Sequence, residues 1–156
     1  MEVEIKLLLK ADEATRLRQR LGDPLRIERH SNRYFDDDAR RLARAGWGLR
    51  VRAIRLDLSG PRTVLTLKHS GDAVGEFQLR PEYETELEPA ETAPDRLLSI
   101  ARELLPDASA LPEVELREIG RMENRREVFA LADRELEQNG QVPRVGHLAV
   151  SDRAGS

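Results

Sequence analysis

The sequence contains no cysteine among its 156 residues. This absence excludes disulfide bonds, zinc sites built from thiolates and cysteine nucleophiles. Histidine is also scarce, because the three histidines His30, His69 and His147 lie far apart and show none of the spacings typical of metal ligands. No run approaches the roughly 18 apolar residues of a membrane-spanning helix, and no basic segment followed by an apolar run opens the chain. We therefore expect no membrane partner, no secretory signal and a cytoplasmic location.

The sequence also lacks an excess of positive charge. Its formal net charge is −3, with 39% hydrophobic and 35% charged residues. A strong basic field is what attracts nucleic acid, so nucleic acid is not an expected partner. Any anion site must arise from local clustering of basic residues. The length predicts a single domain over residues 1–156 that is large enough to bury a sizeable core.

The first six residues, Met1–Lys6, alternate in the manner of a β-strand. Successive strand side chains point to opposite faces, so Glu2, Glu4 and Lys6 share one face and apolar residues share the other. Two interpretations are open for these six residues alone. The segment is either an edge strand with one solvated face or one wall of a cavity that holds metal ions and a polyanion. Recurrence of the pattern downstream decides between them.

Two helices are predicted outside the strands. The first begins near Ala11, with Asp12 as its N-cap, and Gly22 and Pro24 end it. Its arginines are expected to be solvated: Arg16, Arg18 and Arg20. The second helix covers residues 94–105, has a broad apolar face, and is terminated by Pro106.

A triple aspartate, Asp36–Asp38, follows the predicted strand 25–35. Three carboxylates in a row can hold magnesium, but aspartates after a strand are more often turn and N-cap residues. The turn interpretation is the favoured one. One helical turn, with Leu42 pointing inward, is expected over residues 40–45.

The next predicted strands, 49–54 and 63–68, carry basic residues on one face. Apolar side chains alternate with Arg50 and Arg52 in the first and flank Lys68 in the second. A turn at Ser59–Pro61 would join them as a hairpin and bring the three cations onto a shared wall. Like charges facing one another across strands are destabilising, unless an anion neutralises them.

Further alternating segments extend this pattern towards the C-terminus. Residues 69–75 are predicted to be a loop, after which Arg80, Glu82 and Glu84 share a polar face, with Pro81 suggesting an edge or bulge. Later strands are expected at 111–119, 123–131 and 145–150, followed by a frayed end at 152–156.

At least five predicted strands thus have one charged and one apolar face. One such strand would be ordinary solvent exposure. Five indicate an α+β fold in which an antiparallel, closed or nearly closed β-barrel has a charged lumen and helices packed outside. Arginine pairs bidentately with phosphate oxygens, and carboxylates hold magnesium or manganese, so a polyphosphate ligand fits this lumen.

These elements resemble, in order, the motifs of the CYTH domain, the triphosphate tunnel metalloenzyme superfamily. The matching stretches are Glu2-x-Glu4-x-Lys6, Asn32-Arg33-Tyr34-Phe35-Asp36, Gly46-x-Gly48-Leu49-Arg50-Val51-Arg52, Leu65-Thr66-Leu67-Lys68 and Arg80-Pro81-Glu82-Tyr83-Glu84. Arg125 and Arg126 lie where the family has an arginine before an aromatic residue, and Arg126, three residues before Phe129, is favoured. The Arg-Pro-Glu-Tyr stretch resembles bacterial inorganic triphosphatases most closely.

The resemblance implies an eight-stranded antiparallel tunnel that hydrolyses triphosphate-bearing small molecules with Mg²⁺ or Mn²⁺. The triphosphate-binding residues that it implies are Lys6, Arg50, Arg52, Lys68, Arg80, and Arg125 or Arg126. The implied metal ligands are Glu2 and Glu4, with Glu82 and Glu84. Lys6 and Glu4 are the candidate catalytic residues, Lys6 because it would steer or deprotonate the attacking water.

The C-terminal region, residues 132–156, departs from the family pattern. Family members carry a further acidic strand pair there, whereas here Glu135-Leu136-Glu137 comes too soon after Arg126. We therefore interpret this region as atypical or truncated. An open sheet edge would result, and it could pair with a second copy as a homodimer.

Three functions remain open from the sequence. The leading one is a divalent-metal-dependent triphosphatase acting on inorganic triphosphate or a related substrate. A class IV adenylyl cyclase would need a base-recognition pocket that the sequence does not reveal. A non-catalytic module that binds polyphosphate or a nucleotide is the third, and the atypical C-terminal region favours it.

Overall fold

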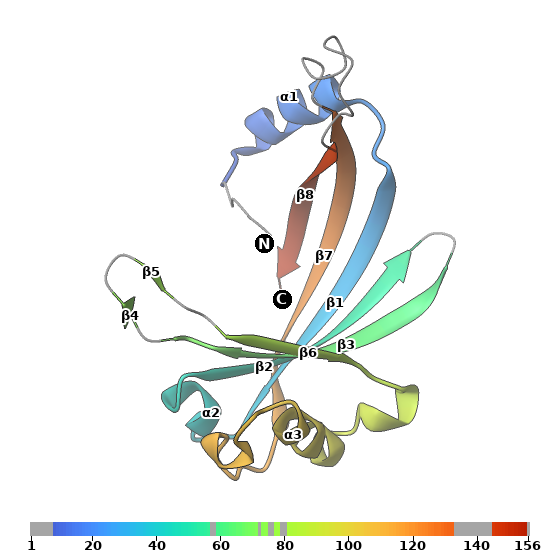
Figure 1. Ribbon diagram of the computed structural model, residues 1–156. Helices are drawn as coiled ribbons and strands as arrows, with labels where there is room; N and C mark the ends of the chain where they lie inside the picture. Colours follow the sequence, from blue (N-terminus) through green and yellow to red (C-terminus); the bar gives the residue numbers. More distant parts are fainter. Residues whose placement is uncertain are drawn as a thin grey trace. The chain divides into compact units, whose positions relative to one another are not determined.

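The computed structural model describes residues 8–56, 59–71, 73–74, 77–78, 81–132 and 145–155 (Figure 1). Its elements, in chain order, are α1 (Ala11–Leu21), β1 (Arg26–Asp36), α2 (Arg41–Arg44), β2 (Trp47–Leu56), β3 (Ser59–His69), β4 (Ala73–Val74), β5 (Phe77–Gln78), β6 (Glu82–Glu86), η1 (Pro89–Glu91), α3 (Pro94–Glu103), η2 (Ala108–Ala110), β7 (Arg117–Ala132) and β8 (Val145–Gly155). No helix in these ranges is long and apolar enough to cross a membrane.

Six of the strands form one antiparallel sheet in the order β6-β3-β2-β1-β7-β8. Together with the helices, this sheet confirms the α+β class predicted from the sequence. Over the described residues the sheet is open, with β6 and β8 as its edge strands. Closure into a barrel is therefore not observed. The predicted strand at residues 1–6 lies outside the described residues.

The described residues divide into two compact units. The first unit comprises those of Met1–Ile27 and Arg126–Ser151, and the second comprises those of Glu28–Arg125 and Asp152–Ser156. In the first unit, α1 begins after Lys10, so the predicted N-cap at Asp12 is wrong. Arg18 of α1 is half-buried, and its Nε lies 3.0 Å from Glu127 Oε1. The prediction that this arginine would be solvated is therefore also wrong.

The core of the second unit lies between the apolar face of its strands and two helices. Figure 1 shows α2 and α3 on the same side of β2, β3 and β6. The main contributors from the strands are Phe35, Leu49, Val51, Leu65 and Leu67, joined by Leu87 just after β6, and those from the helices are Leu42, Leu97, Leu98 and Ala101. The alternation in the sequence thus predicted correctly which side chains of β2 and β3 face the core.

Several boundaries differ from the sequence-based predictions because strand pairing extends beyond the local pattern. Residues 59–61, predicted as a turn, belong to β3, where Ser59 pairs with Leu56. Two short strands, β4 and β5, pair within and just after the predicted loop 69–75. The strand predicted at 123–131 is part of a longer strand, β7, which begins at Arg117 and so includes only the end of the strand predicted at 111–119; residues 111–116 are not in a strand. The predicted frayed end belongs to β8 up to Gly155.

The triple aspartate forms a turn, as favoured from the sequence. The Asp36 carboxylate accepts hydrogen bonds from the backbone N–H groups of Asp37 (2.8 Å), Leu42 (3.0 Å) and Ala43 (3.1 Å). Asp37 likewise accepts from the backbone N–H of Arg41 at 2.8 Å. These carboxylates therefore hold the start of α2 in place, as the turn interpretation expects.

We expect Asp36→Ala to destabilise the protein by about 2 to 3 kcal/mol, because three backbone donors lose their acceptor at a site that is 2% exposed. Chemical denaturation measures this change in the free energy of unfolding. Asp38→Ala is the matched control, since Asp38 makes only an exposed ion pair with Arg117 and should cost about 1 kcal/mol or less. Equal losses for the two variants would contradict the structural role of Asp36.

Candidate functional site

The polar face of the second unit carries five of the predicted site residues. Directly paired residues of neighbouring antiparallel strands lie on the same face of a sheet. In β2 and β3, Arg50 pairs with Thr66 and Gly48 pairs with Lys68. In β3 and β6, Thr66 pairs with Glu84 and Lys68 pairs with Glu82. Arg52 lies two residues from Arg50 along β2, so Arg50, Arg52 and Lys68 share one face with Glu82 and Glu84. We call this surface the charged face.

The register separates the cations more than the sequence suggested. Arg50 lies opposite a threonine, and Arg52 lies opposite Val64. Lys68 lies opposite a glycine on β2 and forms an ion pair with Glu82 on β6, with 3.2 Å between Nζ and Oε2. Like charges are therefore not directly opposed across strands, contrary to the expectation from the sequence, which lowers the repulsion within the free protein.

The arginines of this face are held by neutral oxygen atoms. Arg50 donates from Nη2 to Thr66 Oγ1 at 3.2 Å, and Arg52 donates from Nε to Asn32 Oδ1 at 2.8 Å. Asn32 in turn donates from Nδ2 to the carbonyl oxygen of Met122 at 3.3 Å. Thr66 and Asn32 are each only 1% exposed. An ordinary solvent-exposed sheet face would leave these polar side chains exposed. The charged face differs from such a surface because Thr66 and Asn32 are buried.

Arg50 also has an unsatisfied donor. Its Nε is buried and has no hydrogen-bond partner among the described residues. A buried guanidinium N–H without an acceptor is costly, and an anion that approaches it would satisfy it. This atom is therefore a donor that a bound anion could use.

Glu82 remains ionised on this face at neutral pH. Burial raises the pKa of its carboxyl, but the hydrogen bond and charge of Lys68 lower it more, helped by Glu84 and the charge of Arg50. The net pKa lies below the ordinary value for glutamate. Glu82 therefore carries its negative charge under the conditions in which a divalent cation would bind.

The fit of this face to a divalent metal rests on donor chemistry. Glu82 and Glu84 are two residues apart on β6 and share the charged face. Carboxylate oxygens are the donors that Mg²⁺ and Mn²⁺ prefer. Within the described ranges, no group of three or more acidic or histidine side chains is close enough to hold a metal. The two glutamates therefore fit as part of a set that needs further ligands.

Several predicted site residues cannot be placed together with these. Glu2, Glu4, Lys6 and Arg80 lie outside the described residues, and their roles stay predictions. Arg125 is exposed, whereas Arg126 is half-buried and its Nε has no hydrogen-bond partner in the described part of the chain. The preference for Arg126 over Arg125 stays a prediction.

Sequence reasoning assigned no role to Thr66 or Asn32. Both are neutral residues inside the motif stretches that carry the family resemblance. Their position in these motifs was the only sign in the sequence that they have a role. Their contacts with the arginines depend on residues 16 and 20 positions away in the chain, which local periodicity does not reveal.

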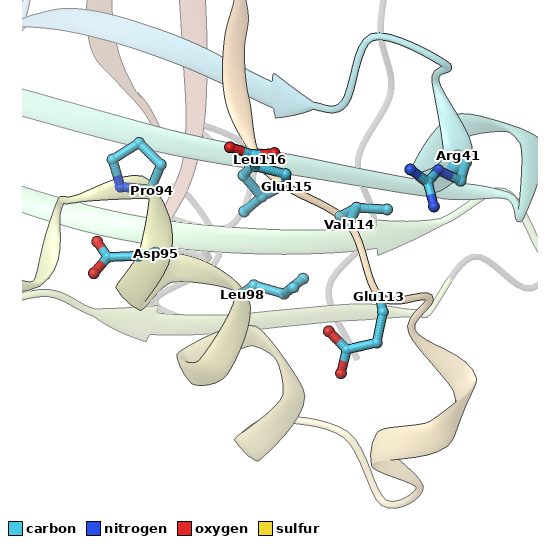
Figure 2. A pocket seen from close by; sticks show the side chains of 8 residues that line it. All are labelled: Arg41, Pro94, Asp95, Leu98, Glu113, Val114, Glu115 and Leu116. Atoms are coloured by element: carbon cyan, nitrogen blue, oxygen red, sulfur yellow. The ribbon is translucent and has the colours of Figure 1, made fainter.

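A groove of about 660 Å³ lies away from the charged face, beside α3 (Figure 2). Its lining residues are Arg41, Pro94, Asp95, Leu98, Glu113, Val114, Glu115 and Leu116. Arg41 is paired with Asp37, and Glu113 is paired with Arg102 at 2.7 Å. Because its only lining cation is already paired and the lining carboxylates outnumber it, this groove is poorly suited to a triphosphate.

Comparison with known protein families gives a match over most of the chain. The model of the CYTH domain family matches residues 1–141. No curated protein matches the sequence.

Three solved structures resemble the chain. The PH1819 protein from Pyrococcus horikoshii OT3 is 20% identical with a TM-score of 0.51, over 78% of this chain and 60% of that one. A candidate adenylate cyclase from Bacillus halodurans is 22% identical with a TM-score of 0.58, over 94% and 70%. HpAC1 from Hippeastrum, a candidate adenylyl cyclase described as having a dominant triphosphatase activity, is 17% identical with a TM-score of 0.59, over 94% and 76%. At these identities the likeness shows the fold, and the chain spans only three fifths of the Pyrococcus protein.

Proposed function

The chain belongs to the CYTH domain family, and we propose that it is a divalent-metal-dependent triphosphatase that hydrolyses inorganic triphosphate or a related triphosphate-bearing molecule. The observation that carries this proposal is the charged face. Three cations and two carboxylates converge there in strand register, and the buried Arg50 Nε lacks an acceptor among the described residues. The activity named for the Hippeastrum protein is compatible with this assignment.

The basic residues of the face would bind the phosphate oxygens. Arg50 and Arg52 project from β2 about 7 Å apart along the strand, a spacing that lets two guanidinium groups bind different parts of one extended anion. Lys68 is paired with Glu82, but both side chains are well exposed. An exposed ion pair contributes only about 0 to 1 kcal/mol, so Lys68 can exchange this partner for a phosphate at little cost.

The carboxylates of β6 would hold the metal. Glu82 and Glu84 would bind Mg²⁺ or Mn²⁺ together with Glu2 and Glu4, and a bound ion of this kind supplies charge neutralisation and an activated water. The arginines would stabilise the charge that develops on the phosphoryl oxygens during transfer. Lys6 would orient or deprotonate the attacking water, as the family resemblance implies.

We further propose that the sheet closes into a tunnel around the charged face. The edges of the described sheet are β6 and β8, and the strand predicted at residues 1–6 would join them. Enclosure would strengthen the interaction of the cations with phosphate by excluding water. The single domain, the cytoplasmic location and the homodimer stay predictions.

An adenylyl cyclase is the second candidate, because two of the structures that share the fold are candidate cyclases. The charged face would serve ATP as well as inorganic triphosphate, since both present a triphosphate. The two reactions differ in their products, because a cyclase releases cyclic AMP and pyrophosphate, whereas a triphosphatase releases inorganic phosphate.

The test is product release from inorganic triphosphate, ATP and thiamine triphosphate, with and without Mg²⁺ or Mn²⁺. We expect metal-dependent phosphate release that falls on the order of tenfold or more in Glu84→Gln, which keeps the shape of the side chain but removes its charge. Glu103→Gln on α3 is the matched control and should not change the rate. Cyclic AMP from ATP would favour the cyclase. Tight binding of triphosphate without release would identify a binding module instead.

A further inference from the structure

Three residues form a straight row across three strands of the charged face. Arg50 of β2, Thr66 of β3 and Glu84 of β6 occupy directly paired positions. The Thr66 hydroxyl accepts from Arg50 Nη2 at 3.2 Å and donates to Glu84 Oε1 at 3.0 Å. Thr66 is thus a neutral side chain between a cation and a carboxylate.

The direction of these hydrogen bonds is determined by their chemistry. Arginine only donates and an ionised carboxylate only accepts, whereas a hydroxyl can do both at once. The single Thr66 proton must therefore point to Glu84, and an oxygen lone pair must face Arg50. Since Thr66 is 1% exposed, water cannot easily take over either contact.

The neighbouring rows are built differently. Lys68 of β3 pairs directly with Glu82 of β6, with 3.2 Å between nitrogen and oxygen. Glu86 of β6 lies opposite Val64 and forms an ion pair with Arg62 of β3, also at 3.2 Å. Among the described residues, Glu84 makes no such ion pair and instead accepts a hydrogen bond from Thr66, its partner on β3. The middle row is the one in which a hydroxyl lies between the cation and the carboxylate and bonds to both.

The strand spacing explains why a threonine achieves this separation. Neighbouring strands lie about 4.8 Å apart, so β2 and β6 are separated by roughly 10 Å. Long side chains can reach across this distance over a small residue. A direct ion pair between Arg50 and Glu84 would then neutralise both charges. The hydroxyl of Thr66 gives each of them a neutral partner instead.

We propose that Thr66 is a positioning residue that keeps Arg50 and Glu84 from neutralising each other, so that the cation stays available to triphosphate and the carboxylate to the metal. This inference rests on the proposed function, because it uses the roles assigned there to these two residues. It adds Thr66, which would contact neither the triphosphate nor the metal and would act through Arg50 and Glu84.

The test measures binding rather than turnover. Calorimetry gives the dissociation constants of tripolyphosphate without metal and of Mn²⁺ without tripolyphosphate. Thr66→Val keeps the shape but removes the hydroxyl, and we expect both constants to rise roughly tenfold, since Arg50 and Glu84 lose the neutral partner that keeps them from pairing with each other. Thr66→Ser keeps the hydroxyl and should stay within about threefold of the wild type. If the valine variant does not fold, Thr66→Ala replaces it, because alanine also lacks the hydroxyl.

Thr63→Val is the matched control, since Thr63 lies on the same strand and faces the other side of the sheet. It should leave both constants unchanged. Unchanged binding in a folded Thr66→Val would overturn the inference, and so would a serine variant as weak as the valine one. A wild type that binds both ligands without releasing phosphate would overturn the hydrolase proposal. The role of Thr66 would still be decided by the dissociation constants of the variants relative to those of the wild type. A wild type that binds neither ligand would overturn both.

Discussion

Replacing Arg50 by alanine should lower kcat/KM for triphosphate hydrolysis roughly 100- to 1,000-fold, the usual cost of removing one donor that stabilises transition-state charge. Arg50 is the cation on the charged face whose Nε is buried without an acceptor among the described residues. Its side chain is oriented by Thr66, so little entropy is lost when a phosphate binds. Steady-state kinetics together with calorimetric binding of tripolyphosphate measure the effect.

Arg55→Ala provides the matched control for this experiment. Arg55 lies on the same strand, five residues further along, and its exposed side chain projects from the other face. Removing it changes net charge by the same amount, so a general electrostatic effect would appear in both variants. Equal losses in the two variants would rule out a specific anion site at Arg50. Arg50→Lys should recover only part of the activity, because lysine keeps the charge but lacks the planar fork.

Truncating Leu67 to alanine should destabilise the protein by about 3 to 5 kcal/mol, the range for fully buried leucines whose cavity does not collapse. Leu67 is 0% exposed and lies in the core on the face of β3 opposite to Thr66 and Lys68. The loss is large because whole-domain stabilities are commonly about 5 to 15 kcal/mol. Urea denaturation followed by circular dichroism measures it.

Leu131→Ala is the control for the core prediction. Leu131 is also a strand leucine, on β7, but it is 41% exposed. Its truncation should therefore cost about 1 kcal/mol or less, because little apolar surface leaves a buried environment. Similar costs at both positions would mean that Leu67 does not contribute to a packed core.

The sequence alone determined which side chains share a face. In β2 and β3 the alternation of apolar and basic residues has the two-residue period of a strand, so Arg50, Arg52 and Lys68 were correctly assigned to one side and the leucines to the other. The helix at 94–105 was predicted for the same reason, because its apolar residues recur at helical spacing. These are local properties, and each can be read from a short window of the chain.

Tertiary structure alone decided which residues face one another across strands. Periodicity fixes the face of a side chain but not the register of its strand. Only the pairing of β2, β3 and β6 shows that Thr66 separates Arg50 from Glu84, while Lys68 meets Glu82 directly. The same holds for the ion pair between Arg18 and Glu127, whose partners are 109 residues apart in the chain. Contacts of this kind depend on long-range pairing, and no local pattern encodes them.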